Sequence, residues 1–167
     1  MFAYRDFDQI NDSHVDAYID ITYPYTPLIS QLLYEQKPFQ SLLRVLDHND
    51  SDVVDCAIGS IVNILYGIVM ESNRVYVHPY YNDLAQIGGI GKIYSLFKRN
   101  VSEFSKSTSA ITIGVAFRNR EIADYSMKVE IINHLKQIIN HRSEDMRREV
   151  KFALRIEIEK GGFKIPD

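Results

Sequence analysis

The sequence of 167 residues contains no tryptophan and a single cysteine, Cys56. One cysteine cannot form an internal disulfide, which excludes a small secreted domain stabilised by disulfides. Residues 1–6 have neither the basic start nor the apolar stretch of a secretory signal. The longest apolar candidate, residues 58–70, is interrupted by glycine, serine and asparagine and falls short of the roughly 18–20 apolar residues that span a bilayer. We therefore expect a cytoplasmic protein without a membrane segment.

The chain also lacks the motifs of common catalytic sites, namely H-E-x-x-H, G-x-S-x-G and a Walker-type loop. Asp47, Asn49 and Ser51 occupy the first oxygen positions of a calcium-binding loop. However, Asp52 stands where that loop requires glycine, and Ile58 stands where it requires glutamate. A polar turn between two helices is therefore the better interpretation.

The histidines and the cysteine give no better candidates. His134 and His141 are seven residues apart, whereas two histidine ligands on one helix face are four apart. Cys56 has no cation near it in sequence, which favours a small buried thiol over a nucleophile. We predict that the protein is not an enzyme, with no catalytic residue, metal ion or cofactor.

The composition is that of a globular protein, with 46% hydrophobic and 25% charged residues, and the length suits one domain. The net charge of −3 is unevenly distributed. Residues 1–60 contain 10 acidic and 3 basic residues, whereas residues 61–167 contain 12 acidic and 16 basic residues. This asymmetry bears on the choice of partner rather than on the fold.

Proline and glycine separate segments that have helical periodicity. Pro24 and Pro27 end the first segment, because residues before proline avoid the helical conformation. Thr26 is a suitable N-cap, with Pro27 at the first helical position. Gly88 and Gly89 permit the sharp turn that ends one helix and begins the next. Helices are predicted at 12–22, 27–35, 38–46, 51–70, 80–87, 90–99, 102–117, 121–129, 131–141 and 143–159. No segment alternates with a period of two, so we predict no β-sheet.

Three hydrophobic triplets recur along the chain with the spacing of one helix face. The triplets are Phe39, Leu42 and Leu46, then Ile90, Ile93 and Phe97, then Ile132, Leu135 and Ile139. They are separated by 51 and 42 residues, and each is followed four or five residues later by a serine that can begin a helix: Ser51, Ser102 and Ser143. The pattern indicates an internal repeat of a short, a medium and a long helix.

A period near 42 with Gly88-Gly89-Ile90 between the first and second helices, and Asn63-Ile64 late in a third, resembles the armadillo repeat and its HEAT relative. The resemblance covers about residues 26–155, although Lys37-Pro38 and Glu130-Ile131 replace the glycines in the other copies. It implies an all-α protein with one domain, 1–167, folded as a right-handed armadillo-like α-solenoid of about three degenerate repeats. The expected repeats are 26–78, 79–119 and 120–160, with 161–167 the interrupted start of a further repeat. An unrelated helical bundle is the alternative.

In armadillo-like proteins the third helix of each repeat lines a concave face that holds extended peptides. The family's asparagine ladder falls here on Asn63, Gly114 and Arg155, and only Asn63 agrees. In place of the ladder we predict a charge gradient, acidic at the first long helix and basic at the last, which would orient a bipolar segment. The predicted partner-binding residues are Asp52, Asp55, Asn63, Ser107, Ala110, Gly114, Arg148, Lys151 and Arg155. The competing interpretation of the charges is a solvated helix face.

These patterns predict a non-catalytic scaffold that binds a protein or peptide in its concave groove. The alternative is a HEAT-like module that binds nucleic acid through the basic part of the chain, residues 92–155. The net charge and the sequence pI near 5.9 argue against it. Self-association through the C-terminal end is a third possibility. Tyr76, Tyr80 and Tyr81 border the irregular segment 66–79 and are the tyrosines we expect at an interface.

Overall fold

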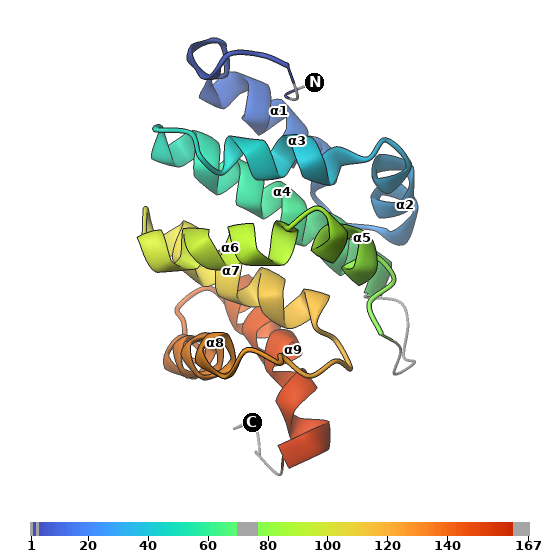
Figure 1. Cartoon of the computed structure of the whole chain (residues 1–167), viewed down its shortest axis with the longest axis vertical. Helices are drawn as coiled ribbons and strands as arrows, with labels where there is room; N and C mark the ends of the chain where they lie inside the picture. The colour runs from blue at the N-terminus through green and yellow to red at the C-terminus, as the bar shows by residue number, and fades with distance from the viewer. Residues whose placement is uncertain (1, 3, 70–76, 162–167) are drawn as a thin grey trace.

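The computed structural model describes residues 2, 4–69 and 77–161, with only the backbone of residues 12 and 155–161. Within these residues the chain forms one 3₁₀ helix, nine α-helices and no strand, so the predicted all-α class is confirmed (Figure 1). The elements are η1 (Phe7–Gln9), α1 (Asp12–Thr22), α2 (Pro27–Glu35), α3 (Pro38–Val45), α4 (Ser51–Val69), α5 (Tyr81–Gln86), α6 (Gly89–Arg99), α7 (Glu103–Ala116), α8 (Tyr125–Gln137) and α9 (Glu144–Gly161).

Side-chain caps explain most helix starts. Asn11, Thr26 and Ser102 each accept a hydrogen bond from the backbone N–H three residues later, which satisfies a donor that the first turn leaves unpaired. The predicted division between helices at 121–129 and 131–141 is wrong, because one helix, α8, runs without a break from the second half of the first segment into the first half of the second. Asp124 caps α8 by accepting the Met127 N–H at 3.0 Å, and no glycine or proline interrupts the helix thereafter.

The glycine pair at 88–89 makes the turn between α5 and α6, as predicted. Gly88 has a φ of 72°, the left-handed conformation that glycine adopts without strain. Gly89 is closely packed, since a Cβ atom there would lie 2.5 Å from Leu84 Cδ1 and 2.8 Å from the Leu84 carbonyl oxygen. The two glycines therefore have different roles, one conformational and one steric.

We predict opposite effects from alanine at two glycines of α6. Gly89→Ala should lower the free energy of unfolding by about 1–3 kcal/mol, because the new methyl group meets the backbone of Leu84. Gly91→Ala should raise it by about 0.5–1 kcal/mol, because nothing lies within 4 Å of a Cβ there and alanine favours the helix. Urea denaturation of both variants checks this, and equal effects would contradict it.

The helices are stacked along the long axis of the molecule, from α1 at one end to α9 at the other (Figure 1). At the centre, α4 contacts α1, α2, α3 and α7, and every residue from Ala57 to Gly67 is buried. In turn, α7 contacts α4, α6, α8 and α9. A helix that is apolar on most of its faces must be surrounded by other helices to keep those faces from water. The long helices α4, α7 and α9 therefore pack against one another in chain order.

The predicted triplets point into the core. Seven of their nine residues are buried, and Ile90 and Ile132 are half-buried. The helices that carry the first two triplets, α3 and α6, contact each other. In contrast, α8 is seen nearly end-on where α3 and α6 run across the view, so the third triplet lies on a helix that is turned relative to the other two (Figure 1).

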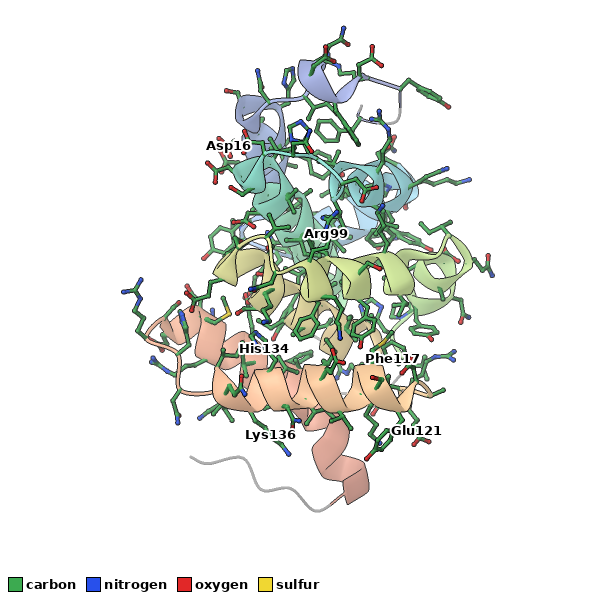
Figure 2. The ribbon with its side chains drawn as sticks, turned by 60° about the vertical axis from the view of Figure 1, so that its left-hand side comes forward. Asp16, Arg99, Phe117, Glu121, His134 and Lys136 are labelled. Atoms are coloured by element: carbon green, nitrogen blue, oxygen red, sulfur yellow. The ribbon has the colours of Figure 1, made fainter. Side chains whose placement is uncertain are left out.

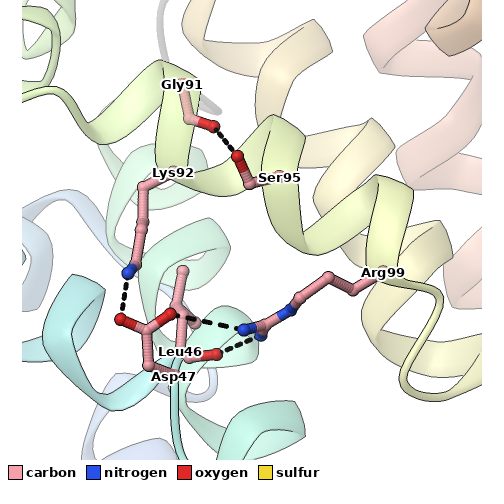
Figure 3. A network of polar contacts seen from close by, with 6 residues as sticks. All are labelled: Leu46, Asp47, Gly91, Lys92, Ser95 and Arg99. Carbon is pink, nitrogen blue, oxygen red and sulfur yellow. Dashed lines mark hydrogen bonds and ion pairs between the residues drawn. The ribbon is translucent and has the colours of Figure 1, made fainter.

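A polar network joins the end of α3 to α6 (Figure 3). The Asp47 carboxylate pairs with Lys92 Nζ and, at 3.3 Å, with Arg99 Nη1. Arg99 Nη2 also donates to the Leu46 carbonyl oxygen. These side chains are partly exposed, so each single pair contributes at most about 1 kcal/mol, but together they orient α6 against α3.

Residues 70–76, including Tyr76, lie outside the described residues, and the segment after them packs against α4. His78 is 1% exposed. Its Nε2 donates to the Leu65 carbonyl oxygen at 2.9 Å, and its Nδ1 accepts the Tyr80 N–H at 3.1 Å. Tyr80 is buried and Tyr81 half-buried, so Tyr80 packs into the core instead of forming the exposed contact that we expected. At the other end, Gly161 is the last residue of α9, and the rest of the expected further repeat lies outside the described residues.

By length and composition alone, α4 could cross a membrane, which the interrupted apolar run did not suggest. The helix has 19 residues, and a stretch of 18 of them has a mean hydropathy of 1.6, which is high enough for a membrane span. In this structure 78% of that stretch is buried, as in the core helix of a helical domain.

Candidate functional site

Four of the nine predicted partner-binding residues are largely covered by other helices, and of these four only Ser107 borders an opening at the surface. Asn63 is buried, and its Nδ2 donates to Thr22 Oγ1 of α1 at 3.0 Å. Ser107 Oγ is hydrogen-bonded to His134 Nε2 of α8 at 3.2 Å. Ala110 has no exposed surface.

The fourth of these residues, Gly114, lies where α7 packs against α9. A Cβ atom at Gly114 would lie 2.7 Å from the Ala153 Cβ. Small residues at this position allow the two helices to approach closely. The predicted centre of the groove is therefore an interface between helices of the same chain.

The charged residues at the two ends of the predicted gradient remain nearer the surface. Asp52 and Arg148 are exposed, and Lys151 is half-buried. Asp55 accepts the Ser102 hydroxyl at 2.7 Å and so joins α4 to the N-terminus of α7. Burial raises the pKa of Asp55, while this hydrogen bond opposes the rise. The side chain of Arg155 lies outside the described residues.

The accessible feature near these ends is a groove beside the first two turns of α7. Its volume is about 650 Å³, and it is lined by Glu103, Phe104, Ser107, His141, Arg142 and Met146. We call it the Phe104 groove. It runs between α7 and the loop that joins α8 to α9, and of the predicted residues it includes only Ser107.

Phe104 is the apolar centre of this groove, with 43% of its surface exposed. A Cβ atom at Gly59 of α4 would lie 3.8 Å from Phe104 Cζ and 2.8 Å from Ile19 Cδ1 of α1. The tip of the Phe104 ring therefore lies close to Gly59 of α4, as does the side chain of Ile19 of α1. The rest of the ring is exposed beside the place where these three helices approach one another.

The groove itself is lined by one acidic and one basic side chain, Glu103 and Arg142, and further charges lie on the neighbouring helices. On the side of α1 and α4, the exposed carboxylates are Asp16, Asp20 and Asp52. Figure 2 shows Asp16 of α1 at the left side of the upper part of the stack, and Lys136 of α8 toward the lower end. On the other side, Arg142 is exposed in the loop between α8 and α9. Carboxylates of α1 and α4 therefore lie on one side of the start of α7, where Asp55 is bonded to Ser102 and Asp16 to Cys56, and Arg142 lines the groove on the other side.

The loop that carries Arg142 is held in place by its neighbour Arg147. Arg147 Nη1 donates to the carbonyl oxygens of His141 at 2.8 Å and Arg142 at 3.0 Å. His141 Nδ1 accepts the Ser143 N–H at 3.1 Å. These bonds order the rim without using the Arg142 guanidinium, which stays available to a partner.

Catalytic chemistry has little support in this region. Cys56 Sγ donates to Asp16 Oδ1 at 3.1 Å, and burial together with this carboxylate raises the pKa of the thiol to about 12. A thiol that stays protonated is a poor nucleophile. Among the described residues, no group of three or more histidine, cysteine, aspartate or glutamate side chains could hold a metal ion.

Sequence reasoning missed Phe104, Glu103, His141, Arg142 and Met146. The available signal was an aromatic residue two positions after the N-cap Ser102, within the first turn of the helix. His134 and His141, considered together in the sequence, belong to different elements, because α8 ends at Gln137 and His141 lies in the loop after it. His134 packs edge-on against Phe97 of α6 at 5.4 Å between ring centroids, and burial lowers its pKa.

Comparison with known proteins adds no family to this description: no family model, no curated protein and no solved structure matches the chain.

Proposed function

We propose that this chain is a non-catalytic protein-binding module of armadillo-like α-solenoid architecture, and that it holds an extended protein segment in the Phe104 groove. The observation that carries the proposal is an exposed aromatic ring in a groove beside α7, with carboxylates of α4 and α1 near the start of α7 and Arg142 in the groove lining. Interfaces commonly combine a buried aromatic anchor with a polar rim.

The architecture rests on the order of helix packing. The long helices α4, α7 and α9 pack in sequence, and α3 packs on α6. These contacts fit stacked repeats, in which each unit buries the apolar stripe of the next. The turned α8, and the loop at residues 117–124 in place of a first helix, depart from a regular repeat, and an unrelated helical bundle is the competing arrangement.

The partner segment follows from the chemistry of the groove. An apolar side chain contacts Phe104 and Met146, a cationic flank faces Asp16 and Asp52, and an acidic flank faces Arg142. The charges set the direction of the segment and speed its capture more than they strengthen the complex. The apolar contact supplies most of the affinity.

A displayed library of random linear peptides, selected against the folded chain, tests this proposal. Peptides with an apolar residue between a basic and an acidic flank should be enriched. Phe104→Ala should weaken their binding by about tenfold or more, because it removes the aromatic anchor. Tyr125→Ala is the matched control, since Tyr125 is 79% exposed on α8 and outside the groove. Equal losses in the two variants, or selection of no such peptides, would contradict the proposal.

The nucleic-acid alternative is weaker, because several cations of the basic part already have carboxylate partners. Lys98 pairs with Glu130 at 2.7 Å, and Arg148 with Asp145 at 2.5 Å. Lys92 and Arg99 share Asp47. A salt titration distinguishes the alternatives, because contacts with several phosphates give a steep loss of affinity with salt. Steep, sequence-independent binding of a DNA or RNA duplex would favour the alternative.

A further inference from the structure

A second cavity lies on a different part of the molecule, between the end of α2, the start of α3 and α5. Its volume is about 360 Å³, within the range of small-molecule sites. Aromatic side chains, carboxylates and one ammonium group line it, and the Phe104 groove shares none of these residues. The lining residues that matter here are Tyr34, Glu35, Lys37, Phe39, Asp83 and Ile87.

The aromatic wall is rigid. Tyr34 stacks on Tyr80, with ring centroids 3.5 Å apart and an interplanar angle of 6°. Phe39 meets Tyr34 edge-on at 6.1 Å and Tyr80 at 6.4 Å. The Tyr34 hydroxyl donates to the Asp83 carboxylate, which ties this wall to α5. The rings therefore form a fixed cluster that does not have to be ordered when a ligand binds.

The charges favour a cation. Glu35 and Asp83 are exposed carboxylates, and Lys37 is the one ammonium group among the lining residues, so the cavity carries a net negative charge. The face of an aromatic ring attracts cations, most strongly those that shed water readily. Ile87, 47% exposed, adds an apolar surface at the rim.

We propose that this cavity binds a methylated ammonium group. Its methyl groups contact the rings of Tyr34 and Phe39 and the side chain of Ile87, and its charge faces Glu35 and Asp83. A small inorganic cation keeps its water and gains little from the rings, while an anion is repelled by the two carboxylates. The group can belong to a free metabolite or to a methylated lysine side chain, which present the same chemistry.

A titration of the isotopically labelled full chain with choline, followed by NMR, tests the proposal. Amide shifts should be concentrated at residues 34–40 and 83–87. The neutral analogue 3,3-dimethyl-1-butanol has the same shape without the charge and should bind about five- to tenfold more weakly. Equal binding of the two compounds, or no choline-dependent shifts at these residues, would overturn the proposal.

Three variants of exposed residues test how binding depends on charge, and asparagine at position 83 keeps an oxygen that can accept the Tyr34 hydroxyl. Glu35→Gln and Asp83→Asn should each weaken choline binding by about three- to fivefold, whereas Lys37→Gln should strengthen it by a similar factor. Asp8→Asn removes an exposed carboxylate from η1, far along the chain from the cavity, and should change nothing. If Lys37→Gln weakens binding, or if all four variants behave alike, the assignment is wrong.

A parallel titration with N-acetyl-trimethyllysine amide identifies the source of the group. Tighter binding than choline, with further shifts at Ile87, supports a lysine side chain of a protein. If N-acetyl-trimethyllysine amide binds no more tightly than choline, the natural ligand is a free metabolite that carries a methylated ammonium group. Failure of both compounds to bind overturns the proposal and leaves the Phe104 groove unaffected, because the two sites share no residue.

Discussion

Replacing Gly67 with leucine should lower the free energy of unfolding by about 3 kcal/mol and the melting temperature by roughly 6–12 °C. A Cβ atom at Gly67 would overlap Ser30 Oγ and lie 2.9 Å from the Thr26 carbonyl oxygen. That carbonyl accepts the Ser30 N–H at 2.9 Å in the first turn of α2. A larger side chain must therefore push the backbone of α2 away from α4, which a rotamer change cannot avoid.

Gly91→Leu is the matched control for this substitution. Gly91 is also helical, but a Cβ there has no neighbour within 4 Å. Leucine favours helix over glycine, so stability should be unchanged or slightly raised. Thermal unfolding followed by circular dichroism compares the two variants. Similar melting temperatures would show that α2 does not pack on α4 at Gly67.

Acidification from pH 7 to pH 5 should change the stability of the wild-type chain little, because the pKa shifts of two groups, the buried His78 and the half-buried Glu149, act in opposite directions. Burial lowers the pKa of His78 to about 4, from 6.5 in the unfolded chain. The unfolded state then binds a proton that the folded state does not, so this group destabilises the fold by about 2 kcal/mol as the pH falls. Its stabilisation is complete above about pH 6.5 and is lost toward pH 4.

Glu149 has the opposite sign. Burial, assisted by the nearby Asp145, raises the pKa of its carboxyl to about 7, from 4.5 in the unfolded chain. The folded state binds the proton more tightly, so this group stabilises the fold by about 2 kcal/mol as the pH falls from 7 to 5. The contribution is complete below about pH 4.5 and is lost as the pH rises through 7.

Single variants separate the two contributions. His78→Gln should become more stable on acidification from pH 7 to pH 5, whereas Glu149→Gln should become less stable, each by about 2 kcal/mol. Urea denaturation at several pH values measures the slopes. If the free energy of unfolding of the two variants depends on pH in the same way, the opposite pKa shifts of His78 and Glu149 are wrong.

Local signals in the sequence were sufficient for most of the secondary structure. The bounds of α1 and α2 match the predicted ranges, because Asn11, Thr26 and Pro27 act on their own helices regardless of the rest of the chain. The wrong helix bounds predicted around α8 also come from a local signal, a cap that was not recognised. Residues 121–124 have helix-compatible composition, and only the cap that Asp124 makes shows where the helix begins.

The candidate site was less predictable from the sequence. Helical periodicity shows which residues share one face of a helix, but it does not show whether another helix packs on that face. Asn63 and Ser107 are polar residues on long helices, and the sequence pattern placed both on an open face. In the fold they contact Thr22 and His134, which are 41 and 27 residues away in the chain. Polar pairs of this kind are satisfied inside the protein, and no local feature of Asn63 or Ser107 indicates the partner.

The amino-acid sequence by itself determined that the protein is helical, where most of its helices begin and end, and that a glycine pair makes the turn at 88–89. These properties depend on backbone conformation and on hydrogen bonds within a few residues. Only the tertiary structure decided which side chains remain accessible. Packing of α1 at Asn63, of α8 at Ser107 and of α9 at Gly114 buries the predicted centre of the binding face, whereas Phe104 remains at the surface.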